Sequence, residues 1–268
     1  MTTKTVALVG ANGLVGKTFA NSFLEQGLDL RILAGSESIN TAVLQELTSR
    51  GASARGISYE YESRIAKALE GVDVLVSTIN AIATPTQFTL IKAAKSAGVK
   101  LFFPIYHLKK TIVNTAKEVG LPYAVLNTGA FPNISLPILR FNFSDKKAGS
   151  EFSPGIVKNH QFTSHKTLSW IANVLKSVPI EQLQNKHLRI QGDTATANDI
   201  IKLWEKKHND KLEVIYHPII ELDERLSADK NDVIAILVRE MASGRGELGG
   251  KDNGLYPSWK PDTLESVL

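Results

Sequence analysis

The chain has 268 residues, of which 43% are hydrophobic, and a formal net charge of +4, so it is long enough to bury a large core. It contains no cysteine, which excludes disulfides, thiolate metal sites and a cysteine nucleophile. The first residues lack a signal-peptide pattern, no apolar run is long enough to span a bilayer, and the basic residues are scattered. We therefore expect a cytoplasmic protein that binds neither membranes nor nucleic acids.

The first predicted element is an apolar strand over residues 4–9 that runs directly into a glycine-rich turn. The segment VALVGANGLVG places Gly10, Gly13 and Gly16 in the spacing G-x-x-G-x-x-G, ahead of a predicted helix at 14–26. Such a turn presents backbone N–H groups to a pyrophosphate at a helix N-terminus. The glycines permit the turn, the close approach of the phosphates and tight packing of the helix. The alternative is a turn whose glycines serve helix packing alone.

Strands and helices alternate through the rest of the first half of the chain. Strands are predicted at 28–34, 54–57, 71–78, 99–103 and 123–127, and helices at 41–50, 63–69, 86–97 and 109–119. Apolar, β-branched segments separated by amphipathic ones give this pattern. It predicts an α/β fold with a doubly wound, right-handed parallel sheet of the Rossmann type, covered by helices on both faces.

The alternation breaks after Thr128. Residues 129–160 contain three prolines and several glycines, which predicts a loop-rich segment that shapes a substrate site. Beyond it, helices are predicted at 167–176, 199–207 and 232–241, short strands at 187–191 and 211–216, and a surface tail at 252–268. We therefore expect a dinucleotide-binding core over 1–128 and a smaller α+β substrate-binding region over 129–268, parts of which pack back on the core.

Several segments of this chain, taken together, resemble the NmrA-like and isoflavone-reductase-like branch of the atypical short-chain dehydrogenases. They are GANGLVG, STIN, QFTLIKAAKSAGV followed by KLFFP, GLPYAVLNTGAF, TATANDIIKLWEKK and YPSWKPDTLESVL. Their order and spacing extend over nearly the whole chain. The resemblance implies a Rossmann domain, a smaller C-terminal substrate domain and NADPH as the usual cofactor. Such families include reductases of phenolic ethers, and also regulators that bind the dinucleotide without turnover.

The cofactor contacts are predicted along the carboxyl edge of the sheet. Backbone and side-chain groups from the glycine turn and from the ends of later strands would contribute, with Asn12 alternatively capping the helix through its side-chain oxygen. The candidates are Gly10, Asn12, Gly13, Leu14, Val15, Ser36, Thr78, Asn80 and Pro104. A plain exit from strand to loop is the alternative for Thr78.

The end of the second strand bears on the choice between NADP(H) and NAD(H). The family usually places an arginine at the position of Gly35, where it pairs with the 2′-phosphate. This chain has Ser36 and Glu37 after that glycine, and Arg31 lies inside the strand. A serine hydroxyl supplies no charge. The resemblance therefore favours NADP(H), while the local residues leave NAD(H) or no dinucleotide open.

The segment after the fifth strand carries the candidates for catalysis. The reductases resembled here have Pro-Ser-Glu-Phe-Gly, a loop and a helix with the catalytic lysine. Here Pro104 begins PIYHL and the helix follows at once. Counting back from LPY at 121–123 puts Lys109 at the lysine position. Alternatively, Tyr106 and Lys110 form Y-x-x-x-K, in which the lysine lowers the tyrosine pKa for proton donation.

Three further residues are expected near the substrate. His107 is a candidate proton relay, with packing under the cofactor as the alternative. Phe131 and Phe152 are candidates for an apolar wall, with core packing as the alternative. His160 and His165 lack acidic partners at metal-ligand spacing, so no metal site is expected.

These observations predict an NAD(P)H-dependent reductase of a small, largely apolar organic substrate, of the kind found in secondary metabolism. Two alternatives remain open. One is a dinucleotide sensor that regulates a partner without turnover. The other is a non-redox cyclase or isomerase built on the reductase scaffold. The absence of an arginine at the position of Gly35 favours this alternative.

Overall fold

The computed structural model describes residues 5–79, 84–105, 109–128, 130–150, 160–162, 167–243 and 249–268. The chain divides into two units. Unit 1 comprises Met1–Asn127, Leu168–Leu188 and Gly254–Pro257, and unit 2 comprises Thr128–Thr167, Arg189–Asn253 and Ser258–Leu268.

The central sheet of unit 1 has five strands in the order β3-β2-β1-β4-β5, and every neighbouring pair is parallel. The strands are β1 (Thr5–Val9), β2 (Asp29–Gly35), β3 (Ser53–Ile57), β4 (Val74–Ser77) and β5 (Leu101–Pro104). This arrangement confirms the predicted Rossmann-type sheet. All carboxyl ends lie at one edge, with Val9 in register with Leu33 on one side and Ser77 on the other.

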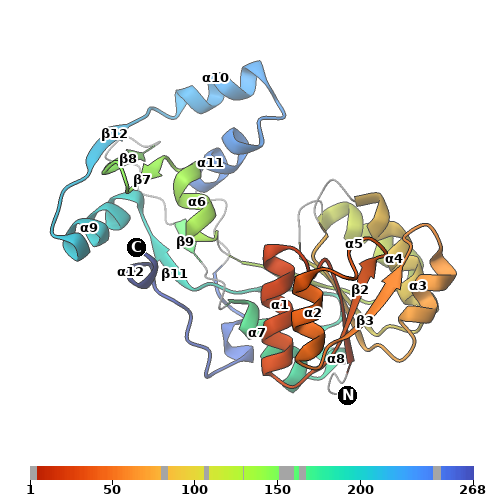
Figure 1. Cartoon of the computed structure of the whole chain (residues 1–268). Helices are drawn as coiled ribbons and strands as arrows, with labels where there is room; N and C mark the ends of the chain where they lie inside the picture. The colour runs from red at the N-terminus through yellow and green to blue at the C-terminus, as the bar shows by residue number, and fades with distance from the viewer. Residues whose placement is uncertain are drawn as a thin grey trace. The chain divides into compact units, whose positions relative to one another are not determined.

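Helices cover both faces of this sheet (Figure 1). They are α1 (Leu14–Glu25), α2 (Ala42–Ser49), α3 (Glu62–Ala68), α4 (Thr84–Ser96) and α5 (Lys109–Val119). Alternate residues of each strand point to opposite faces. Val9, Leu33, Leu75 and Phe102 therefore join one core cluster with residues of α3, α4 and α5. The helix α1 packs beside β1, β2 and α2.

A later part of the chain completes unit 1. It contains α7 (Thr167–Ser177), α8 (Ile180–Leu183) and β10 (Lys186–Arg189), and β10 pairs with β6 (Ala124–Asn127). Trp170 of α7 is fully buried. Its side chain and those of Leu175 and Ile180, which are equally buried, supply the apolar area that stabilises this addition.

Unit 2 is a smaller α+β unit with its own core. Its helices are α6 (Pro132–Ile138), α9 (Ala197–His208), α10 (Ile220–Ala228), α11 (Val233–Ser243) and α12 (Leu264–Val267). Its strands are β7 (Phe141–Asn142), β8 (Lys147–Ser150), β9 (His160–Phe162), β11 (Asp193–Ala195) and β12 (Glu213–Tyr216), of which β12, β8 and β7 form one sheet and β11 pairs with β9.

Two expectations for this half of the chain need correction. Residues 129–160 were expected to be loop-rich, yet their described part contains α6, β7 and β8. The tail was expected to lie on the surface, yet Leu264 is 1% exposed within the unit 2 core, and its backbone N–H donates to Asp193 Oδ2 at 2.8 Å. In both cases apolar contacts distant in sequence override the local pattern. None of the helices in the described ranges is long and apolar enough to cross a membrane.

Candidate functional site

The order of strands creates a switch point between β1 and β4. The chain passes from β1 to β2 on one side and later returns to place β4 on the other. Helices leaving adjacent strands in opposite directions open a crevice at the carboxyl edge, which is where such folds bind ligands. The glycine-rich turn follows β1 and Thr78 follows β4. The first candidate contacts therefore lie together at this edge.

Thr78 holds the two sides of the switch point together. Its backbone N–H and its hydroxyl both donate to the carbonyl of Val9, at 2.9 and 2.8 Å. The residue is 7% exposed. Because its hydroxyl proton is committed to Val9, this side chain shapes the turn, and a contact to the cofactor would have to use the oxygen lone pairs.

The three glycines have different surroundings. Gly10 has φ +90°, and a Cβ there would lie 2.5 Å from Thr78 Oγ1. A Cβ on Gly16 would lie 2.0 Å from the carbonyl oxygen of Gly10. Both positions therefore exclude a side chain for reasons internal to the fold. A Cβ on Gly13 would meet only the Gly10 oxygen, at 3.4 Å, so this glycine leaves space for a ligand.

The N-terminus of α1 suits an anion. Gly13 is the N-cap residue, it has no side chain to cap the helix, and the first turn has no acidic residue. The first backbone N–H groups of a helix have no partner within it, and the helix dipole favours negative charge there. Leu14 and Val15 are the first two residues of α1, so their backbone N–H groups are among those without a partner in the helix. These features fit the pyrophosphate of a dinucleotide.

Asn12 makes contacts that the sequence did not predict. Its Nδ2 donates to the carbonyl of Ser38 at 3.2 Å, and its Oδ1 accepts from Thr41 Oγ1 at 2.7 Å. The alternative in which Asn12 caps α1 is wrong, because Gly13 occupies the N-cap position and the Asn12 oxygen is turned to Thr41. Thr41 itself caps α2. Asn12 thus ties the glycine turn to the loop after β2.

The loop after β2 is short and exposes its polar residues. Ser38 N–H donates to the carbonyl of Gly35 at 2.9 Å, which closes a turn with Ser36 and Glu37 at its centre, both exposed. Arg31 does not reach this turn. Its Nη1 donates to the carbonyls of Ala68 and Glu70 at 3.0 and 2.8 Å, where it caps the end of α3.

Two buried polar groups near the carboxyl edge have no hydrogen-bond partner among the described residues. They are Ser77 Oγ, at the end of β4, and Gln87 Oε1, in the first turn of α4. Gln87 is only 3% exposed. Buried polar atoms are normally satisfied. An unpartnered amide oxygen at this edge is therefore a place where a bound water or ligand would gain a hydrogen bond.

Replacing Gln87 by leucine tests whether its buried amide oxygen destabilises the ligand-free protein. The apolar side chain removes the cost of burying an amide oxygen without a partner, so the free protein should gain about 1 kcal/mol and its Tm should rise by about 2–4 °C. Calorimetry of the ligand-free protein measures the shift. Gln182→Leu, at an exposed position of α8, is the control and should leave Tm unchanged. A lower Tm for Gln87→Leu would mean that the amide already has a partner, such as a bound water.

The candidates for catalysis lie at the start of α5. Lys109 is the first residue of that helix and Lys110, beside it, is exposed. Pro104 is buried at the end of β5, in register with Ser77. Tyr106, His107, Asn80 and Phe152 lie outside the described residues, as does the side chain of Lys109.

Phe131 belongs to unit 2, where it is half-buried and precedes the first turn of α6. Its carbonyl accepts from Ser135 N–H at 2.8 Å and from Ser135 Oγ at 2.9 Å. The residue therefore begins a helix, and an apolar wall of the substrate site remains a proposal for it.

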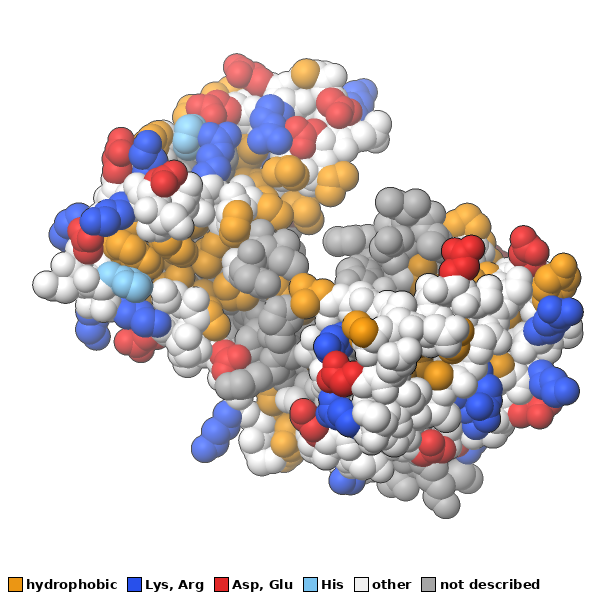
Figure 2. Space-filling model, in the orientation of Figure 1, with side chains coloured by type: hydrophobic (Ala, Val, Ile, Leu, Met, Phe, Trp, Pro, Cys, Tyr) orange, Lys and Arg blue, Asp and Glu red, His pale blue; other side chains and the backbone are white. Residues whose placement is uncertain are grey.

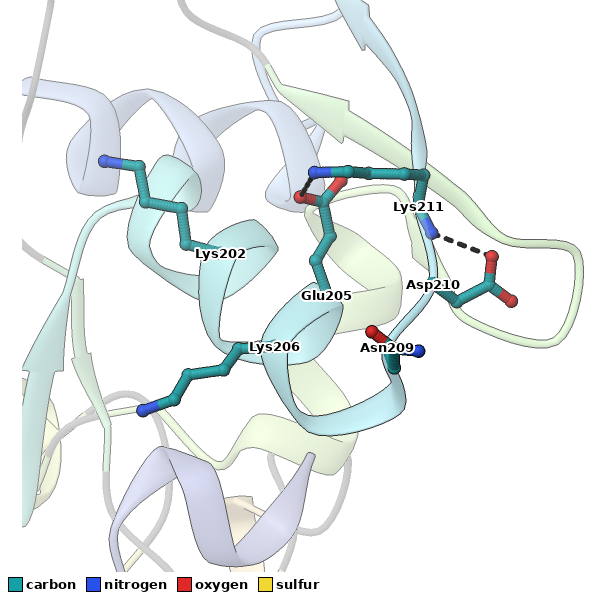
Figure 3. A pocket seen from close by; sticks show the side chains of 6 residues that line it. All are labelled: Lys202, Glu205, Lys206, Asn209, Asp210 and Lys211. Carbon is teal, nitrogen blue, oxygen red and sulfur yellow. Dashed lines mark hydrogen bonds and ion pairs between the residues drawn. The ribbon is translucent and has the colours of Figure 1, made fainter.

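A cavity of about 360 Å³ lies at the end of α9, and Figure 3 shows the side chains that line it. Its lining residues are Lys202, Glu205, Lys206, Asn209, Asp210 and Lys211. Each of the two carboxylates already has a lysine partner. Lys146 and Lys211 hydrogen-bond to Asp210 and Glu205 respectively, and both contacts lower the carboxyl pKa. Because every side chain that lines this pocket is charged or polar, it suits a largely apolar substrate poorly. In the described part of the chain no group of histidine and acidic side chains is arranged to hold a metal ion.

Comparison with known proteins shows which family the first part of the chain resembles. The model of the NmrA-like family matches residues 2–105, a range that contains the glycine turn, the switch point and all five strands of the sheet. This N-terminal part of the chain is similar to the NmrA-like family. The resemblance predicted from the motifs is therefore confirmed.

The curated relatives of this chain include reductases and reductase-like proteins of plants. The chain is 25% identical to phenylcoumaran benzylic ether reductase PT1 of Pinus taeda, over 98% of this chain and 97% of the relative. It is 26% identical to an isoflavone reductase homolog of Solanum tuberosum, over the same shares. The first alignment spans 304 positions, more than the 268 residues of this chain. The chain therefore lacks segments that this relative carries.

Solved structures show the same fold. AtPrR2 with NADP+ and (+)pinoresinol superposes with a TM-score of 0.82 at 20% identity, over 100% of this chain and 98% of the other. An isoflavone reductase superposes with a TM-score of 0.81 at 18% identity, over 100% and 99%. A leucoanthocyanidin reductase of Vitis vinifera in complex with NADPH gives 0.77 at 18%, over 98% and 97%. These complexes agree with the NADP(H) that the resemblance favours.

Proposed function

We propose that this protein is an NAD(P)H-dependent reductase of a small, largely apolar organic substrate. The observation that carries the proposal is the open N-terminus of α1 at the switch point. There Gly13 leaves space for a phosphate, while Gly10 and Gly16 are required by the fold itself. The chain aligns along almost its full length with a relative named as a reductase and with another named as a reductase homolog. This supports reduction as the reaction.

In this proposal the bound cofactor supplies a hydride. The residues of the chain bind and orient the cofactor and deliver a proton to the substrate. The first backbone N–H groups of α1, at Leu14 and Val15, bind the pyrophosphate. Thr78 fixes the turn that presents them. The ammonium of Lys109 donates a proton to the substrate oxygen that leaves or becomes a hydroxyl, or holds the ribose. In the alternative, Tyr106 donates the proton and Lys110 lowers its pKa.

Unit 2 is the proposed substrate region, and its helices expose apolar side chains. On α11, Val233 and Ile234 are 62% and 47% exposed, and Ile220 of α10 is 55% exposed. Hydrophobic side chains gather over this part of unit 2 (Figure 2). A monomeric protein rarely exposes a contiguous apolar surface without a binding role. An aromatic, weakly polar substrate is consistent with it, and the relatives named for phenylcoumaran benzylic ethers point to the same chemical class.

The test has two stages. The first is a thermal-shift titration with NADPH, NADP+, NADH and NAD+. A ligand at hundredfold excess over its Kd should stabilise the folded protein by about 2.7 kcal/mol. The second follows oxidation of the reduced cofactor with a panel of phenolic benzylic ethers, lignans and enones. Binding with turnover supports the reductase. No shift with any of the four dinucleotides would overturn the proposal.

The same experiment separates the two alternatives. Binding without turnover across the panel would indicate a dinucleotide sensor. Turnover at full rate by protein stripped of dinucleotide would indicate a cyclase or isomerase. In both cases the glycine turn would keep its structural role, so the result concerns the chemistry and not the fold.

A further inference from the structure

The loop after β2 is the part of the site that would receive the adenosine ribose, because it follows the strand adjacent to β1 at the carboxyl edge. Its sequence from Gly35 to Thr41 contains no lysine or arginine, and its one charged residue is the exposed Glu37. A 2′-phosphate carries a charge close to −2 and is normally held by an arginine or lysine. This loop supplies no such partner.

The neighbouring cations of unit 1 have other partners. Arg31 caps α3 through two carbonyls. Lys17 of α1 forms an ion pair with Glu46 of α2 at 2.9 Å. Arg50 bonds to Asn21 and lies 3.6 Å from the same Glu46. Recruiting any of them to a phosphate would break a contact that the fold already makes.

Arg55 is a further cation among the described residues of the sheet. It lies on β3, the edge strand, in register with Leu33 and therefore two residues short of Gly35. Its Nη1 donates to the carbonyl of Ala54 at 3.3 Å, and the side chain is exposed. The guanidinium is thus directed to its own strand. Its contribution can be measured separately.

The loop is also held in position. The bonds from Asn12 to Ser38 and Thr41, together with the turn between Gly35 and Ser38, join it to the glycine turn on one side and to α2 on the other. A site that is fixed before binding cannot readily bring a distant cation to the ligand. The only charge that the loop itself carries is that of Glu37.

We infer that this protein binds NADH about as tightly as NADPH, because the described loop after β2, which Asn12 holds in place, contains no lysine or arginine for the 2′-phosphate. The inference rests on the proposed function, since it requires that a dinucleotide binds at all. It assigns Asn12 as the positioning residue of the ribose end of the site.

The experiment measures Kd for NADPH and NADH by calorimetric titration at low and high salt. The two constants should agree within about threefold. Their ratio should barely change with salt, because no ion pair to the 2′-phosphate is screened. An NADPH affinity at least tenfold higher than that for NADH would overturn the inference and leave the proposed function intact. No binding of either would instead refute the proposed function.

Variants make the test specific. Gly35→Arg should raise NADPH affinity at least tenfold and leave that for NADH unchanged, because a Cβ at Gly35 meets no atom within 4 Å and the guanidinium can pair with the phosphate. Gly56→Arg is the matched control, with equal space, in register with Ala34 and so on the opposite face of the sheet. It should change neither constant. Arg55→Ala should also leave the ratio unchanged, and a tenfold loss of NADPH affinity there would overturn the inference.

Discussion

Gly13→Ala is expected to leave the protein folded and to weaken dinucleotide binding at least tenfold, equivalent to about 1.4 kcal/mol. The backbone at Gly13 has φ −77° and ψ 159°, which alanine adopts without strain. The new Cβ would touch only the Gly10 oxygen, at 3.4 Å, but it would occupy the space through which the phosphates reach the N–H groups of α1. Titration calorimetry measures the Kd, and urea unfolding measures the stability.

Gly16→Ala, three residues along the same turn, is the matched comparison. Its Cβ would lie 2.0 Å from the Gly10 oxygen and 2.8 Å from Thr78 Oγ1, so the backbone must shift. The cost should be about 3 kcal/mol of stability, seen as a lower urea midpoint. Equal stability losses for the two variants would show that all three glycines serve packing. Unchanged binding by Gly13→Ala would exclude a phosphate cradle at this turn.

Lys109→Met should lower kcat by about 10²–10⁴, the usual worth of a positioned proton donor, once a substrate has been found. The Kd for NADPH should change little if the lysine acts on the substrate, and should rise if it holds the ribose. Lys110→Met, at the exposed neighbouring position, is the control and should retain full activity.

The opposite pattern would identify the other arrangement. If Lys110→Met and Tyr106→Phe each abolish turnover while Lys109→Met does not, the Y-x-x-x-K pair carries the proton. If all three variants keep full activity, neither assignment is correct, and the proton reaches the substrate from another group.

The sequence predicted the first half of the fold closely because its signals are local. Apolar segments of four to eight residues, amphipathic segments and glycine stops are read within one element. The strand predicted at 54–57 became Ser53–Ile57, and the helix predicted at 109–119 became Lys109–Val119. The second half was predicted less well. The helix α10 and the strands β7 and β8 were missed, because short elements that pack on distant partners have weak local signals.

The candidate site shows the same division. The glycine spacing pointed to the turn, and the departure at Gly35 from the usual arginine pointed to the ribose end, both from neighbouring residues alone. The partners of Asn12 could not be read in this way, because Ser38 and Thr41 lie 26 and 29 residues away. The helix cap made by Arg31 depends on carbonyls 37 and 39 residues distant. A polar side chain can bind a ligand or stabilise the fold, and its role can be assigned only when its hydrogen-bond partners are known.

By itself, the sequence determined that this chain builds a parallel sheet that opens with a glycine turn, since hydrophobic periodicity and glycine placement are properties of adjacent residues. Only the tertiary structure showed that the three glycines have different roles. Gly10 and Gly16 pack against Thr78 and one another, whereas Gly13 faces open space. It also decided that the nearby arginine is engaged elsewhere. The surroundings of the glycines and the partners of the arginine both depend on which groups distant in sequence lie nearby. The packing of strands and helices sets those neighbours, and the order of the elements along the chain does not.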